Sequence, residues 1–130
     1  MHRVLITGAA VLLILHGVIH LMGTMAYWKL GKIEALPYKT TLLGGAWNVG
    51  DTGIRVVGGL WLVPALGFVV SGIALLAGAG WWSPVVALMA VVSLGLTLLD
   101  WSVAYAGAVV NVVILGVLWL GPAVSRWLSR

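Results

Sequence analysis

The sequence predicts an all-α membrane protein whose four transmembrane helices form an up-down antiparallel bundle. Two observations lead to this fold class. Of the 130 residues, 62% are hydrophobic and 8% are charged, which is too few charged side chains to cover a soluble domain. The hydrophobic residues also gather into runs close to the roughly 20 residues that a helix needs to cross a bilayer. The length allows one domain, so residues 1–130 are expected to form a single transmembrane unit.

The hydrophobic runs predict helices over residues 4–25, 56–77, 84–100 and 103–120. Backbone N–H and C=O groups in lipid must pair within their own segment, so runs of this length are expected to be helical. Tryptophans support these boundaries, because an aromatic belt lies where spans meet the membrane surface. Those at the expected span ends are Trp28, Trp81, Trp82, Trp101 and Trp119.

The one long connection is expected over residues 27–55. It begins with several charged residues and continues into a glycine-rich stretch over residues 44–53. Trp47 within this stretch indicates that it lies along the membrane surface or partly re-enters the membrane. The other two connections are only a few residues long, which makes the second, third and fourth spans antiparallel neighbours.

The formal net charge of +4 comes from basic residues at the span ends, which favours contact with lipid headgroups and argues against nucleic acid as a partner. An even number of spans puts both termini on one side. Arg3 before the first span resembles the start of an anchor with a cytoplasmic N-terminus, so both termini are expected in the cytoplasm. The chain has no cysteine, which excludes disulfides and thiolate metal sites.

Polar residues inside the expected spans are informative because lipid makes them costly. His16 and His20 lie four residues apart, which puts both on one face of the first span. Ser93, Thr97 and Asp100 form a stripe on the third span by the same helical spacing. All of these residues fall in the half of the bundle next to the long loop.

Further polar residues fall at matching depth in the other two spans. Asn111 lies in the fourth span, and Asp51 and Arg55 are four residues apart at the start of the second, a spacing that suits an ion pair. We therefore expect a ligand-binding site in this half, with two tryptophans at its rim. Its candidate residues are His16, His20, Asp51, Arg55, Ser93, Thr97, Asp100, Asn111, Trp47 and Trp101.

Depth in the membrane also predicts individual contacts. His16 is expected about 13 Å from the interface, taking roughly 1.5 Å per residue along the first span. A charged imidazole at that depth would be costly, so His16 should be neutral and hydrogen-bonded to Asn111 or Ser93. His20, nearer the surface, should approach Asp100 or the ion pair at the start of the second span.

Each candidate also has a structural interpretation. Asp51 can cap the second span, Asp100 can pair with Arg55 among the headgroups, and Asn111 can hydrogen-bond one helix to another. For the two histidines, structural and functional roles both stay open.

Metal binding is a further possibility for the histidine pair. Two imidazoles on one helix face supply half of a zinc or copper site, which Asp100, Asp51 or Met25 would have to complete. These residues lack the spacing of a metal motif, so we assign no metal or other cofactor and keep only His16 and His20 as metal candidates.

The stretch from Leu15 to Gly23, together with Asp100-Trp101, Gly107 and Asn111, resembles small four-span bacterial membrane proteins of uncharacterised or DoxX-like type. This resemblance implies the four-helix layout, and no activity or residue role follows from it. We accordingly expect the chain in the bacterial inner membrane.

Three functional hypotheses follow. The leading one is a non-catalytic binding or accessory protein that holds a lipid-like or quinone-like molecule or docks to a larger membrane complex. The second is a small oligomeric transporter or channel, in which His16 would carry the proton. The third is a membrane enzyme or metal-binding protein that uses His16 or His20. Membrane lipids, and a larger complex or further copies of the chain, are the expected partners.

Overall fold

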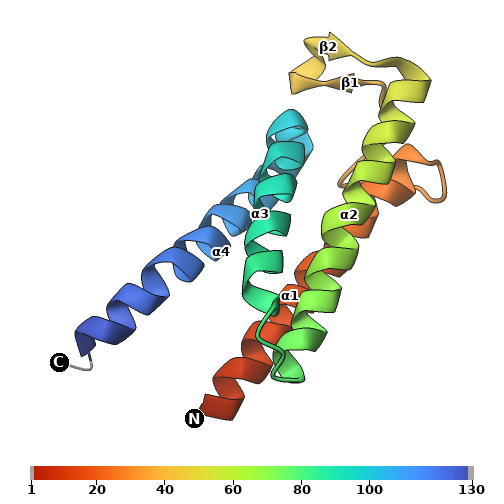
Figure 1. The fold of residues 1–130 in the computed structure, drawn as a ribbon. Coiled ribbons are helices and arrows are strands. Elements are labelled where there is room, and N and C mark those ends of the chain that lie inside the picture. The colour runs from red at the N-terminus through yellow and green to blue at the C-terminus, as the bar shows by residue number, and fades with distance from the viewer. Residues whose placement is uncertain (1, 129–130) are drawn as a thin grey trace.

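The computed structural model describes the backbone of residues 2–128 and the side chains of residues 3–123. Its main elements are the helices α1 (His2–Tyr27), α2 (Gly50–Leu76), α3 (Trp82–Leu99) and α4 (Trp101–Leu128), shown in Figure 1. Within the described residues, all four are long and apolar enough to cross a membrane. The all-α, four-span fold class is therefore confirmed.

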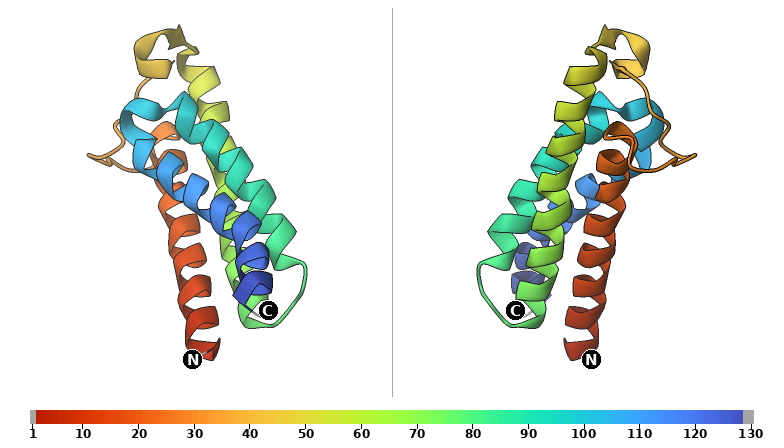
Figure 2. Two further views of the ribbon diagram at one scale, coloured as in Figure 1. Left: turned by 90° about the vertical axis from the view of Figure 1, so that its left-hand side faces the viewer. Right: turned by 90° about the vertical axis from the view of Figure 1, so that its right-hand side faces the viewer.

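The helices run alternately up and down, as expected. α1 packs along α2, and α3 packs against both α2 and α4. Figure 2 shows that the first turn of α1 and the last turns of α4 lie at the same end of the molecule. We call this the terminal half of the bundle, and the half next to the long loop the loop half. Figure 1 shows α4 leaning away from α1 and α2 towards its C-terminal end, so the bundle is splayed in the terminal half.

Two helix boundaries differ from the expectation. α2 begins at Gly50, six residues before the expected start at residue 56, so the long connection covers residues 28–49. Gly50 has a φ of 68° and its N–H donates to Asn48 Oδ1 (3.0 Å), which sets the start of the helix. α4 continues through Gly121 and Pro122 to Leu128, whereas it was expected to end at residue 120. A proline inside a helix removes one backbone donor, which α4 tolerates here.

The glycine-rich stretch folds into a small hairpin that the sequence did not predict. β1 (Thr41–Leu42) pairs antiparallel with β2 (Trp47–Asn48), and a turn of 3₁₀ helix, η1 (Leu43–Gly45), joins them. The three turn residues all have positive φ, which is why two of them are glycines. The hairpin sits at the outer end of the loop half (Figure 1), and Leu42 of β1 is buried in the core cluster that the helices form there.

Glycines bring α1 and α2 into backbone contact. A Cβ atom on Gly17 of α1 would lie 2.7 Å from the carbonyl oxygen of Ala65, and one on Gly72 of α2 would lie 2.9 Å from that of Ala10. Thr24 adds a hydrogen bond across the same interface, from its hydroxyl to the Gly58 carbonyl (2.7 Å). Small residues allow this close approach, which is a common way for helices to associate in membranes.

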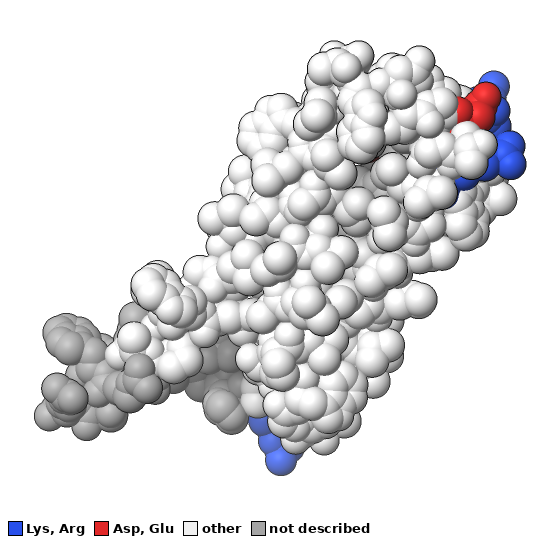
Figure 3. Space-filling model, turned by 45° about the horizontal axis from the view of Figure 1, so that its top comes forward, with Lys and Arg blue, Asp and Glu red and all other residues white. Residues whose placement is uncertain are grey.

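Charged side chains are confined to the ends of the molecule. Figure 3 shows them gathered at the loop end, with a basic side chain at the opposite end and an uncharged surface between. This distribution is the one that a bilayer requires, because the hydrocarbon core excludes unpaired charge.

Candidate functional site

Four polar side chains meet near the middle of the bundle and form a closed set of hydrogen bonds. His16 Nε2 lies 3.1 Å from Asn111 Oδ1, and Asn111 Nδ2 donates to Ser93 Oγ at 2.6 Å. Ser93 Oγ also contacts His20 Nε2, and His20 Nδ1 lies 2.7 Å from the backbone oxygen of His16. We call His16, His20, Ser93 and Asn111 the polar ring.

The polar ring is buried and held between three helices. His16 is 8% exposed and His20 is 2% exposed, while Ser93 and Asn111 have no exposed surface. The histidines come from α1, Ser93 comes from α3 and Asn111 from α4. α4 otherwise leans away from α1, so the His16–Asn111 hydrogen bond is a direct link between these two helices.

Aromatic side chains of α2 form the remaining wall. The centroid of the Phe68 ring lies 4.8 Å from that of His16, and the Trp61 ring lies 5.4 Å from His20. The two imidazoles stand edge to face with centroids 4.5 Å apart. These contacts leave the imidazoles little freedom to rotate, so the directions of their hydrogen bonds are fixed by packing.

The structure confirms one predicted contact and corrects another. The hydrogen bond between His16 and Asn111 is present, as their matching depth indicated. The predicted approach of His20 to Asp100 or to the second-span ion pair is wrong, because His20 bonds to Ser93 and to the carbonyl one turn back on its own helix. Both of its ring nitrogens are thus occupied inside the polar ring.

Asp100 belongs to a separate cluster in the loop half. It is 1% exposed, and its carboxylate accepts a hydrogen bond from the Tyr27 hydroxyl. Lys39 Nζ lies 2.5 Å from Asp100 Oδ1 and 3.3 Å from Ser102 Oγ. The expected pairing of Asp100 with Arg55 is therefore replaced by a pairing with Lys39, which reaches down from the long connection.

Sequence reasoning missed both partners of Asp100. Tyr27 was detectable, because it follows His20 by seven residues and so lies on the same stripe of the first span. The contact of Lys39 with Asp100 could not be predicted in this way, because Lys39 lies in an irregular segment without helical spacing.

Asp51 and Arg55 lie at the surface and outside the polar ring. Asp51 accepts a hydrogen bond from the Tyr38 hydroxyl and lies 3.7 Å from Lys29 Nζ, so its ion pair is with Lys29 and not with Arg55. The hydrogen bond to Asp51 raises the pKa of Tyr38. Arg55 uses its carbonyl to accept from Trp28 Nε1 at 2.8 Å. These contacts fix the long connection against the start of α2.

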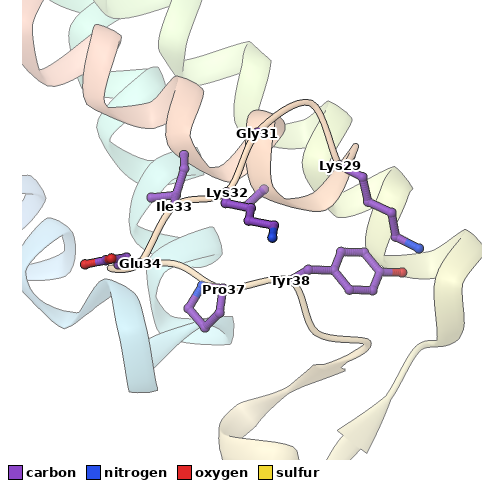
Figure 4. Close-up of a pocket in the computed structure, with 8 residues that line it drawn as sticks. Lys29, Gly31, Lys32, Ile33, Glu34, Pro37 and Tyr38 are labelled. Atoms are coloured by element: carbon purple, nitrogen blue, oxygen red, sulfur yellow. The ribbon is translucent and has the colours of Figure 1, made fainter.

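Beside these contacts the long connection forms a surface pocket of about 550 Å³ (Figure 4). Lys29 and Lys32 line it together with Glu34 and Tyr38. Basic and acidic side chains therefore both line this pocket.

The other sequence candidates are also outside the polar ring. Thr97 is buried, but its hydroxyl donates to the Leu94 carbonyl of its own helix (3.0 Å). Trp47 and Trp101 are about half exposed, at 53% and 52%. They do not form the rim of a cavity around the histidines, because the loop half is filled by its own packed side chains.

A crevice of about 600 Å³ opens on the other side of the polar ring, between α1 and α4 in the terminal half. The expectation of a cavity in the loop half is thus corrected, because it is the divergence of α4 that leaves space. Two lining side chains carry polar atoms: the imidazole of His16 and the indole N–H of Trp82. The other lining residues are apolar: Ala9, Leu12, Leu13, Leu15, Ile19, Leu75, Val86, Val109, Val110, Val113, Ile114, Val117 and Leu118.

Metal-binding side chains do not gather elsewhere in the described part of the chain. No group of three or more His, Cys, Asp or Glu side chains is placed to share a metal ion among residues that the structure describes. In the histidine pair, both Nε2 atoms take part in hydrogen bonds of the polar ring.

Comparisons with known proteins add no relative: no protein-family model, curated protein or solved structure matches the chain.

Proposed function

We propose that the protein is a non-catalytic membrane protein that binds one lipid-like molecule in the crevice between α1 and α4. The apolar chain of the molecule would lie along the crevice, and its polar head would lie against His16. A single observation carries this proposal: the crevice is lined by apolar side chains and the indole of Trp82, and the buried imidazole of His16 is the one side chain in it that can accept a hydrogen bond.

The dimensions of the crevice support this proposal. Its volume of about 600 Å³ lies inside the range of roughly 300–1,000 Å³ that small-molecule sites occupy. A mainly apolar lining with a few polar groups is also typical of such sites, because the apolar part supplies affinity and the polar part fixes orientation. His16 would be the orienting group.

The position of the crevice favours a lipid-like ligand over a water-soluble one. It lies between helices that are apolar enough to cross a membrane, and their outward faces carry exposed aliphatic side chains such as Val18 of α1 and Val112 of α4. A molecule that reaches His16 from lipid would keep its chain in an apolar environment throughout, and a hydrogen bond to the imidazole would offset the dehydration of its polar head.

The cellular setting is part of the same proposal. We place the chain in the inner membrane of a bacterium with both termini in the cytoplasm, where membrane lipids would be the nearest source of ligand. The exposed apolar faces of α1 and α4 would also allow the protein to act as an accessory subunit of a larger complex or to assemble with further copies of itself.

Native mass spectrometry of the detergent-purified protein tests the proposal. Val113→Trp fills the crevice, whereas Val112→Trp puts the same bulk on the neighbouring position, which does not line it; both valines are 57% exposed. We expect a retained lipid-like adduct on the wild type and on the Val112 variant, and its loss from the Val113 variant. Equal retention by both variants would contradict the proposal.

A second variant separates ligand holding from folding. His16→Leu preserves approximate bulk and removes both ring nitrogens. If His16 orients the ligand, the variant should lose the adduct while its helical circular dichroism remains. Loss of fold together with the adduct would indicate a structural histidine. The Val112 and Val113 variants would then decide whether the crevice binds the lipid-like molecule.

A further inference from the structure

The hydrogen bonds of the polar ring have a direction that one backbone atom determines. The carbonyl oxygen of His16 can only accept a hydrogen bond, so His20 Nδ1, 2.7 Å away, must carry a proton and donate it. In a neutral imidazole the other nitrogen is then unprotonated. His20 Nε2 is therefore an acceptor, and the hydroxyl of Ser93 is the group that donates to it.

The direction continues around the ring from this point. Ser93 uses its one proton on His20, so its oxygen must accept from Asn111, and it does so from the Nδ2 amide group at 2.6 Å. The Asn111 oxygen then faces His16 Nε2 at 3.1 Å, and an amide oxygen can only accept. His16 Nε2 must therefore carry the proton.

The opposite orientation of the Asn111 amide does not satisfy these groups. It would place a carboxamide oxygen against Ser93, which would then have to direct its single proton to Asn111 and leave His20 Nε2 without a donor. If His20 were doubly protonated, its Nε2 would not need a donor. The imidazole would then carry a buried positive charge with no carboxylate among its hydrogen-bond partners, which is costly in a membrane. The neutral ring with a single direction is the arrangement in which every pairing has one donor and one acceptor.

One ring nitrogen of the two histidines makes no hydrogen bond to any residue that the structure describes. With its proton on Nε2, neutral His16 has an unprotonated Nδ1, and within the described residues this atom has no hydrogen-bond partner. It is also not among the fully enclosed polar atoms that lack a partner, so it keeps surface towards the crevice that the His16 ring lines. The crevice therefore contains a hydrogen-bond acceptor that no described protein group uses.

We propose that the head of the bound molecule donates a hydrogen bond to Nδ1 of His16, so that the crevice selects a long-chain alcohol or a related amphipath with a hydroxyl head. This inference rests on the proposed function and adds the class of ligand to it. Ethers, esters and ketones of the same length only accept hydrogen bonds, and would place an acceptor against an acceptor.

The first measurement addresses the polar ring without any ligand. Nitrogen NMR of ¹⁵N-histidine-labelled protein in detergent at neutral pH, assigned by single substitution of each histidine, reports which ring nitrogen carries the proton. We expect opposite tautomers, with the proton on Nε2 of His16 and on Nδ1 of His20. A proton on Nδ1 of His16, or a doubly protonated ring, would overturn the inference.

The second measurement compares two probes with the same sixteen-carbon alkyl chain, hexadecanol and its methyl ether. The alcohol should shift the Nδ1 resonance of His16, and the ether should leave it unmoved and bind about threefold to tenfold more weakly, as expected for one net hydrogen bond. The Val113→Trp variant should bind neither probe, and Val112→Trp should bind both as the wild type does.

The outcomes separate this inference from the proposed function. If both probes bind equally in the crevice, or bind without moving the His16 resonance, the choice of a donor head is wrong and the binding function stands. If neither probe binds in a Val113-dependent way, the binding function itself fails, and the inference fails with it.

Discussion

At the scale of single residues, a buried polar side chain contributes to the stability of the fold mainly through its hydrogen bonds. A buried polar group that loses its partner keeps the full cost of its dehydration, whereas a group that has no partner can be removed at no loss. Two buried serines of this chain represent the two cases. Ser93 makes two hydrogen bonds inside the polar ring, and Ser71 is equally buried with an Oγ that has no partner among the described residues.

These two serines give the first prediction. Ser93→Ala should destabilise the protein by about 1–3 kcal/mol, because it leaves Asn111 and His20 without their partner. Ser71→Ala removes an unpaired hydroxyl and should be neutral or stabilising. Denaturant titration in detergent micelles, followed by circular dichroism, measures both. Equal losses for the two variants would show that the hydrogen bonds of Ser93 do not account for its contribution to stability.

The buried carboxylate of Asp100 gives the second prediction. Lys39→Met leaves this carboxylate without its charge partner and should cost about 3–5 kcal/mol in the same titration. Adding Asp100→Asn to the same protein removes the buried charge and should recover most of that loss. Lys32→Met serves as the control, since Lys32 is exposed and has no carboxylate at ion-pair distance within the described residues. A Lys39 effect as small as the Lys32 effect would contradict this account.

Contacts of the candidate site could be predicted from the sequence only where the depth of two residues in the membrane is enough to bring them together. His16 and Asn111 meet because both lie near the middle of the membrane, and their sequence positions are enough to show it. His20 lies nearer the loop, and depth suggested Asp100, but a carbonyl on its own helix and a hydroxyl on α3 satisfy it first. Lys39 then takes the place beside Asp100. Such competition between partners depends on side-chain geometry, which hydrophobic periodicity does not encode.

At the scale of helices, the α1–α2 pair is the closely packed unit and α4 is the loosely attached one. Glycine at position 17 allows the α1 backbone to lie directly against the α2 carbonyl of Ala65. In α4, Gly116 has open space where a side chain would project. Glycine therefore allows close helix packing in α1, whereas in α4 it faces open space.

This contrast gives the third prediction. Gly17→Ala puts a methyl group 2.7 Å from the Ala65 carbonyl oxygen, so the helices must separate, at a cost of about 1–3 kcal/mol from overpacking. Gly116→Ala meets no atom within 4 Å and should stabilise α4 by up to about 1 kcal/mol through helix propensity. Thermal unfolding of both variants in one detergent measures the difference. A Gly17 variant as stable as the Gly116 variant would show that the backbones are not in contact.

The helices themselves were predictable, and their tilt was not. Runs of apolar residues near span length leave helix as the only conformation that lipid permits, so the four elements follow from composition and length. The start of α2 at Gly50 and the hairpin before it depend on a few positive φ angles, which have no periodic signature. The divergence of α4, which opens the crevice, depends on how side chains of different helices fit, and no single segment carries that information.

At the scale of the whole molecule, the two ends differ in construction. The loop end is closed by the hairpin and by the ion pair of Lys39 with Asp100, and it carries most of the charged side chains (Figure 3). The terminal end is open between α1 and α4, and the crevice lies there. A ligand at His16 would therefore be reached from the terminal half, which the proposed orientation places on the cytoplasmic side.

That orientation gives the fourth prediction, and the absence of cysteine from the sequence makes it simple to test. Lys32→Cys puts a thiol in the long connection, and Gly80→Cys puts one in the exposed turn between α2 and α3 at the terminal end. An exposed thiol reacts with a maleimide through its thiolate, which forms in water and not in lipid. With both termini in the cytoplasm, a membrane-impermeant maleimide added to intact cells should label the Lys32 variant. The Gly80 variant should react only after permeabilisation. The reverse pattern would place the crevice on the outer side of the membrane, and labelling of both variants in intact cells would mean that the protein inserts in two orientations.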